Sequence, residues 1–84
     1  MKIEVRYFAL LREAAGAEVE SVELEDGAPL LGDLLGALEG RGDRLGEMIR
    51  ERPILCAVNR NYAGREAPLK DGDEVAIFPP VSGG

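Results

Sequence analysis

The end of the chain carries a group that could take part in chemistry, a free carboxylate on two glycines. The stretch runs Phe78-Pro79-Pro80-Val81-Ser82-Gly83-Gly84. Because proline fixes φ and cannot donate to a strand ladder, Pro79 and Pro80 are expected to end the last strand and begin an extended tail. Glycine has no Cβ, so Gly83 and Gly84 form a backbone thin enough to enter a narrow site. A frayed terminus or a cloning scar would give the same two glycines.

The rest of the chain holds few groups that could catalyse a reaction by themselves. It has no histidine, the usual general base near pH 7, and its serines are Ser21 and Ser82, so no nucleophile–base pair can be assembled. The lone Cys56 stands among apolar residues, cannot form an internal disulfide and lacks metal-ligand spacing. We therefore expect a buried core thiol, no metal site and no catalytic machinery in this chain.

Length and charge indicate one small cytoplasmic domain. The 84 residues are 45% hydrophobic and 31% charged, and no apolar run approaches the roughly 20 residues that span a bilayer. No signal peptide follows Met1, so a cytoplasmic location is expected. Sixteen acidic residues against ten basic ones give a net charge of −6, which repels phosphate backbones and suits partners with basic surfaces. Neither nucleic acid nor a membrane is expected as a partner.

Four segments have the alternation or the apolar run of a β-strand. They cover residues 2–9, 18–24, 54–59 and 74–78, and a short edge strand is expected within the irregular segment 62–68. The segment 54–59 is apolar on both parities, which is typical of an interior strand. In the second strand Val19 and Val22 have opposite parity, so we expect a bulge or a later strand start. Turns are expected at 25–27, 59–61 and 71–73.

Helical patterns lie between these strands. Residues 10–15 predict about one turn that stops at Gly16. The main helix is expected to begin near Pro29, with Asp33 close to its positive N-terminal end. Its apolar stripe has the spacing i, i+3, i+4 and i+7, namely Leu31, Leu34, Leu35 and Leu38. Asp43 is expected to cap a second, shorter helix whose apolar side is Leu45, Met48 and Ile49.

Two phenylalanines fall on the otherwise polar faces of their strands. Phe8 shares its parity with charged residues of the first strand, and Phe78 shares its parity with Glu74 in the last strand. If these two strands are parallel neighbours, both rings lie together at the root of the tail. An exposed aromatic pair is typical of a protein-binding patch, whereas packing under a loop is the alternative for either ring.

The order of these elements predicts an α+β fold with a mixed sheet of four to five strands and one main helix on one face. That is the order of the β-grasp, or ubiquitin-like, fold. We expect a single domain over residues 1–80 and a flexible tail over residues 81–84.

The sequence also resembles the small, sulfur-carrying subunits of molybdopterin synthase, the MoaD/ThiS-type ubiquitin-like carriers, which are related to the thiazole-synthesis sulfur carrier. The resemblance covers essentially the whole chain. Its blocks are Tyr7-Phe8-Ala9 with Arg12-Glu13 and Gly16, then Ala57-Val58-Asn59, and the segment 69–84. In the last block, the Asp71-Gly72-Asp73-Glu74-Val75 turn and strand leads into Pro-Pro-Val-Ser-Gly-Gly, and this combination is the most specific part.

The resemblance implies a sulfur carrier in molybdenum cofactor biosynthesis. In such carriers an ATP-dependent, E1-like enzyme adenylates the terminal glycine, and sulfur from a donor protein converts it to a thiocarboxylate. The tail then enters the large synthase subunit, where the sulfur passes to cyclic pyranopterin monophosphate. By this resemblance Gly84 bears the sulfur, and the threading residues are Pro79, Pro80, Val81, Ser82 and Gly83. The residues implied to bind partners are Phe8, Arg12, Tyr62 and Phe78.

The same resemblance implies a non-catalytic subunit that binds no cofactor directly, in an assembly with two copies of each synthase subunit. Other functions fit the same features: sulfur carriage for thiamin thiazole or for tRNA thiolation, a ubiquitin-like protein modifier, and a plain binding module with an inert tail. The Pro-Pro neck favours the molybdopterin carrier over the thiazole carrier by family analogy.

Overall fold

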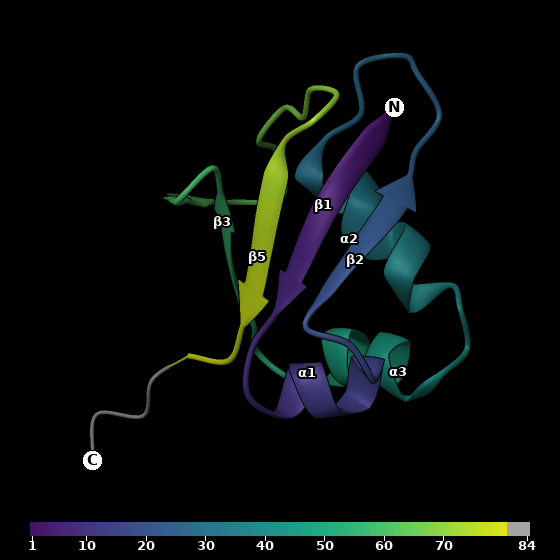
Figure 1. Ribbon diagram of the computed structural model, residues 1–84, viewed down its shortest axis with the longest axis vertical. Helices are drawn as coiled ribbons and strands as arrows, with labels where there is room; N and C mark the ends of the chain where they lie inside the picture. Colours follow the sequence, from purple (N-terminus) through teal and green to yellow (C-terminus); the bar gives the residue numbers. More distant parts are fainter. Residues whose placement is uncertain (81–84) are drawn as a thin grey trace.

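The structure, a computed structural model, describes residues 1–80. Within them, five strands form one mixed sheet in the order β2-β1-β5-β3-β4 (Figure 1). The first and last strands are parallel neighbours in the middle of the sheet, and the other pairs are antiparallel. The strands are β1 (Lys2–Tyr7), β2 (Val19–Glu23), β3 (Leu55–Val58), β4 (Asn61–Ala63) and β5 (Glu74–Phe78). The predicted mixed sheet is confirmed, and the parallel pairing on which the meeting of Phe8 and Phe78 depends is present.

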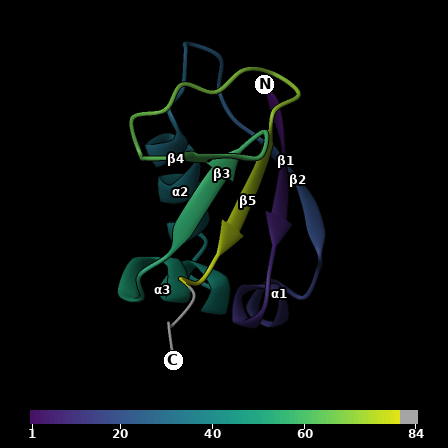
Figure 2. The same cartoon turned by 90° about the vertical axis from the view of Figure 1, so that its left-hand side faces the viewer.

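The helices cover one face of this sheet. They are α1 (Leu10–Ala15), α2 (Leu31–Glu39) and α3 (Arg44–Glu51). All four leucines of the predicted stripe on α2 are at most 2% exposed, and they pack with the inward side chains of the strands. Two views show α1 and α3 at the end of the sheet toward which β1 and β5 run (Figure 1 and Figure 2). Among residues 1–80, no helix has the length and apolar character needed to cross a membrane.

The predicted helix ends are present. Gly16 closes α1 in the left-handed region, with φ 73°. Near the start of α2, the Asp33 carboxylate accepts a hydrogen bond of 2.7 Å from the Leu30 amide. Asp43 caps α3 by accepting a hydrogen bond of 2.9 Å from the Gly46 amide.

Several strand boundaries differ from the prediction by one or two residues. The first strand stops at Tyr7 rather than at Ala9, because the backbone of Ala9 turns into α1 with φ 54° and ψ −129°. The second strand starts at Val19, and its pairing with β1 runs without a bulge. Val19 therefore belongs to the strand on the face opposite to Val22, and neither a bulge nor a start after Val19 reconciles the two parities. Val19 is 39% exposed on the outer face, whereas Val22 is buried.

The helices α2 and α3 approach each other very closely at Gly46. A Cβ on this residue would lie 2.6 Å from the Leu38 carbonyl oxygen and 2.9 Å from that of Glu39, both in the last turn of α2. A Cβ atom in a protein essentially never lies within 3.0 Å of a non-bonded backbone atom. The crossing of the two helices therefore requires glycine at this position.

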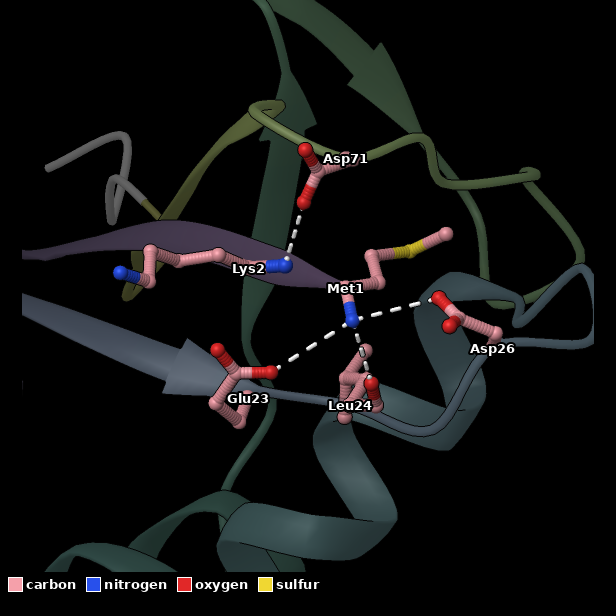
Figure 3. A network of polar contacts seen from close by, with 6 residues as sticks. All are labelled: Met1, Lys2, Glu23, Leu24, Asp26 and Asp71. Atoms are coloured by element: carbon pink, nitrogen blue, oxygen red, sulfur yellow. Dashed lines mark hydrogen bonds and ion pairs between the residues drawn. The ribbon is translucent and has the colours of Figure 1, made fainter.

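The start of β1 is held by a network of polar contacts (Figure 3). The Met1 ammonium donates to the Leu24 carbonyl oxygen at 2.9 Å and pairs with Asp26 Oδ1 at 3.3 Å and Glu23 Oε2 at 3.5 Å. The Lys2 amide donates to Asp71 Oδ1 at 2.7 Å. Burial opposes the Met1 charge, but Asp26 and Glu23 together raise the pKa of this ammonium. The network joins β1 to the loops after β2 and before β5.

A second polar network joins β1, β2 and the segment between α2 and α3. The Tyr7 hydroxyl donates to Glu20 Oε1 at 2.6 Å, and the Arg41 guanidinium donates to the same oxygen at 2.9 Å. The Arg41 hydrogen bond, with a further contribution from Tyr7, holds the pKa of Glu20 below its ordinary value of 4.5. Burial and the Glu20 hydrogen bond raise the pKa of Tyr7, so its hydroxyl remains a donor.

This network makes stability depend on acid in a defined direction. Because folding lowers the Glu20 pKa, its contribution is fully present above pH 4.5 and is lost as pH falls through the folded-state pKa. We expect Glu20→Gln to lower the free energy of unfolding by about 0.5–1 kcal/mol at neutral pH, since the pair is partly exposed. Urea denaturation of both proteins over a pH series measures this difference. A difference that stays constant down to about pH 3 would contradict the assignment.

Candidate functional site

Three aromatic rings meet on the outer face of the sheet, which the helices leave uncovered. The Phe8 and Phe78 ring centroids lie 6.3 Å apart in an edge-to-face arrangement. Tyr62 lies 5.9 Å from Phe78 at a tilt of 55°. We call Phe8, Tyr62 and Phe78 the aromatic cluster. The ring quadrupoles favour the edge-to-face arrangement of Phe8 and Phe78.

The sheet register brings these residues together. Parallel pairing aligns Tyr7 with Ile77, so Phe8 follows beside Phe78, and the Phe8 amide donates to the Ile77 carbonyl oxygen at 3.3 Å. Tyr62 reaches Phe78 from the edge strand β4, across β3. The sequence analysis expected the two phenylalanines to meet if their strands were parallel neighbours, and the structure shows both the pairing and the contact. For Tyr62, the sequence predicted only a short edge strand somewhere within residues 62–68, and not its register.

The cluster is open to solvent. Phe8 is 46% exposed and Tyr62 is 77% exposed, while Phe78 is half-buried between its neighbours. Leu55 pairs with Phe78 across β3 and β5 and is 39% exposed on the same face. Sequence reasoning missed Leu55, because an interior strand that is apolar on both parities suggests burial on both faces. The helices cover only one face of this sheet, and that fact exposes Leu55.

The other predicted site residues are the two prolines after β5, Arg12 on α1 and the last four residues of the chain. Pro79 is half-buried and Pro80 is exposed directly after β5, as expected for residues that end a strand. Arg12 lies exposed on α1, where its guanidinium pairs with Glu18 Oε1 at 3.8 Å. Val81, Ser82, Gly83 and Gly84 lie outside the described residues. The partner-binding roles of Phe8, Arg12, Tyr62 and Phe78 stay predictions.

The one thiol of the chain is separate from this surface. Cys56 is 6% exposed, with its side chain in the core cluster on the inner face. Burial raises the pKa of the Cys56 thiol to about 11, so it is protonated and unreactive at neutral pH. The predicted core thiol is confirmed. The described part of the chain thus presents an exposed apolar surface on the outer face of the sheet, apart from this buried thiol.

A family model described as the ThiS family matches residues 5–84 of the chain. The chain belongs to the ThiS family. The match includes both strands that carry the phenylalanines and extends through the C-terminal glycines. It therefore confirms the resemblance to ubiquitin-like sulfur carriers that the sequence blocks indicated.

Individual members of this family are similar over their full length. The molybdopterin synthase sulfur carrier subunit of Chlamydomonas reinhardtii is 44% identical, with all of both chains covered. That of Escherichia coli strain K12 is 37% identical, over 98% of this chain and 99% of the relative. The small archaeal modifier protein 3 of Haloferax volcanii is 38% identical, with all of both chains covered.

Solved structures of the family share the fold. The crystal structure of small archaeal modifier protein 1 from Haloferax volcanii matches with a TM-score of 0.79 and 33% identity, covering all of both chains. A chain in the complex of subunits 1 and 2 of the molybdopterin-converting factor from Helicobacter pylori matches with a TM-score of 0.68 and 28% identity, also covering all of both chains. The predicted β-grasp fold is confirmed.

Proposed function

We propose that this ThiS-family chain is the sulfur carrier subunit of a molybdopterin synthase and carries sulfur as a thiocarboxylate on Gly84. The observation that carries the proposal is the position of the aromatic cluster, an exposed docking surface at the end of β5. The residues from Pro79 to Gly84 follow that strand directly. Full-length similarity to relatives named as molybdopterin synthase sulfur carrier subunits supports it.

The proposed chemistry explains why the chain needs only its terminal carboxylate. A carboxylate is a poor acyl donor, because oxide is a very poor leaving group. Attack of the Gly84 carboxylate on the α-phosphate of ATP gives an acyl adenylate and releases pyrophosphate. A sulfur nucleophile then attacks the acyl carbon and AMP leaves. The activating enzyme and the sulfur donor protein supply the catalytic groups for both steps.

The partners follow from this chemistry. The large synthase subunit and an E1-like adenylating enzyme would both bind the aromatic cluster, one at a time, while the terminus enters their active sites. From Pro80 to Gly84 an extended backbone reaches roughly 15 Å. The Helicobacter pylori complex of subunits 1 and 2 supports the first contact. A synthase with two copies of each subunit, located in the cytoplasm, belongs to the same proposal.

A second candidate function is protein modification, favoured by the similarity to small archaeal modifier protein 3. The intact mass of the protein purified from its own cells distinguishes the two. We expect a population in which one terminal oxygen is replaced by sulfur. Covalent adducts to other proteins would support the modifier instead. A terminus that stays unmodified with ATP and the cognate activating enzyme would contradict both functions.

The docking role of the aromatic cluster has its own test in Phe78→Ala. Removing this half-buried ring takes away the centre of the cluster, so affinity for the large subunit should fall by at least about tenfold. Calorimetric titration of the two purified subunits measures the change. Val19→Ala is the matched control, because Val19 is also exposed on the outer face but lies on the edge strand β2. If Phe78→Ala instead collapses thermal stability, Phe78 is a core residue and not a docking residue.

A further inference from the structure

The turn between β3 and β4 has a strained residue at its tip. Asn59 and Arg60 connect the paired residues Val58 and Asn61, and both have positive φ, 48° for Asn59 and 71° for Arg60. Two-residue hairpin turns of this kind favour Asn followed by Gly, because both positions have positive φ, which asparagine tolerates and glycine adopts freely. Arginine in that position adopts a backbone conformation that its Cβ disfavours.

Local contacts account for Asn59 but not for Arg60. The Asn59 side chain donates to Asp73 Oδ1 at 2.9 Å and accepts from the Glu74 amide at 3.0 Å, while its own amide donates to the Glu74 carbonyl oxygen at 2.8 Å. These bonds tie the turn to the start of β5. Within residues 1–80, the Arg60 side chain has no hydrogen bond and no ion pair. No polar contact of the folded domain therefore accounts for arginine at this position, where glycine would adopt the same backbone conformation with less strain.

The Arg60 side chain instead lines a surface hollow on the outer face of the sheet. The hollow is shared with Arg6, Phe8, Glu74 and Ala76, so one of its walls is a ring of the aromatic cluster. Arg6 is neutralised there, because it pairs with Glu74 at 2.9 Å and with Glu4 at 3.1 Å. Of the charged side chains that line the hollow, Arg60 is the one without an ion pair among residues 1–80.

We propose that Arg60 is a docking residue that binds a carboxylate on the partner protein seated on the aromatic cluster. The inference rests on the proposed function, in which the large synthase subunit covers this surface. A guanidinium binds a carboxylate through two parallel N–H donors, so the pair fixes orientation as well as attraction. The backbone strain at Arg60 is then balanced by binding rather than by folding. The partner should present an acidic side chain opposite the hollow. This local contact differs from the overall expectation for a chain of net charge −6, which suits partners with basic surfaces.

The test uses Arg60→Gly, because this change should affect stability and binding in opposite directions. Relief of strain should raise the thermal stability, whereas loss of the guanidinium should lower the affinity for the partner. Glycine relieves the left-handed strain, so Tm should rise by about 4 °C. Loss of the guanidinium should weaken binding of the purified large subunit by about tenfold at low salt. The affinity difference from wild type should shrink as sodium chloride rises from about 0.05 M to about 0.5 M, since salt screens the pair.

Arg65→Ala is the matched control, because it also removes one exposed arginine. Arg65 lies away from the aromatic cluster, in a groove that it shares with Leu31 and Leu35 of α2. It should leave the affinity unchanged. The inference is overturned if Arg60→Gly binds as tightly as wild type, if its weaker binding persists at high salt, or if its Tm falls. If wild type itself does not bind the large subunit, the proposed function fails and this inference fails with it.

Discussion

Deletion of Gly84 is expected to abolish molybdopterin formation while the folded domain remains intact. The deletion leaves a carboxylate on Gly83, which is the same chemical group on an equally thin residue. The reacting carbon is, however, withdrawn by about 3.5 Å along an extended backbone. A misplacement of even about 1 Å can cost a factor of about 100 in rate, so sulfur transfer should fall below detection.

The fold should not respond to this deletion, because every residue of the core cluster lies at or before Ile77. The measurement is product formation in a reconstituted synthase assay, with thermal unfolding recorded on the same samples. Ser82→Ala is the control, since it alters the tail without changing its length and should keep activity. A truncated chain that still makes molybdopterin would show that Gly84 does not carry the sulfur.

The largest effect on stability is expected from Gly46→Ala. The added Cβ would meet the carbonyl oxygens of Leu38 and Glu39 at 2.6 and 2.9 Å, and backbone atoms at a helix crossing cannot move aside easily. Overpacking of this kind costs about 1–3 kcal/mol, and the separations here place the cost at the upper end. Urea denaturation with linear extrapolation measures the loss.

Gly36→Ala is the matched control for this prediction. Gly36 lies inside α2, and a Cβ at this position would meet nothing within 4 Å. Because alanine is the better helix former, this change should stabilise the protein by about 1 kcal/mol. Equal stabilities for the two variants would mean that the helix crossing is looser than the structure indicates.

Sequence periodicity predicted the elements whose residues make mostly local contacts. The leucine stripe of α2, the Asp43 cap and the Gly16 stop each follow from spacing within a few residues. The parity of Phe8 and Phe78 within their strands was also predictable, although their meeting depended on the condition that the two strands pair in parallel. The sequence therefore indicated two residues of the candidate docking surface, but not its full extent.

The rest depends on contacts between distant segments, which spacing does not encode. Leu55 is exposed because helices cover one face of the sheet only. The close approach at Gly46 depends on how two helices cross, and the position of Tyr62 depends on the register of a three-residue strand. The strain at Arg60 arises from a turn geometry that the dipeptide Asn-Arg does not normally favour.

The central pairing of β1 with β5 also affects when the docking surface comes into being. Phe8 is synthesised near the beginning of the chain and Phe78 near its end, and neither has its ring partner until the last strand inserts beside the first. Contacts between distant segments slow folding, because a long loop must close before they are made. A nascent chain on the ribosome, or a product cut short before β5, thus has no assembled surface to offer. A partner that docks on this surface would therefore distinguish chains in which β5 has paired with β1 from chains in which it has not.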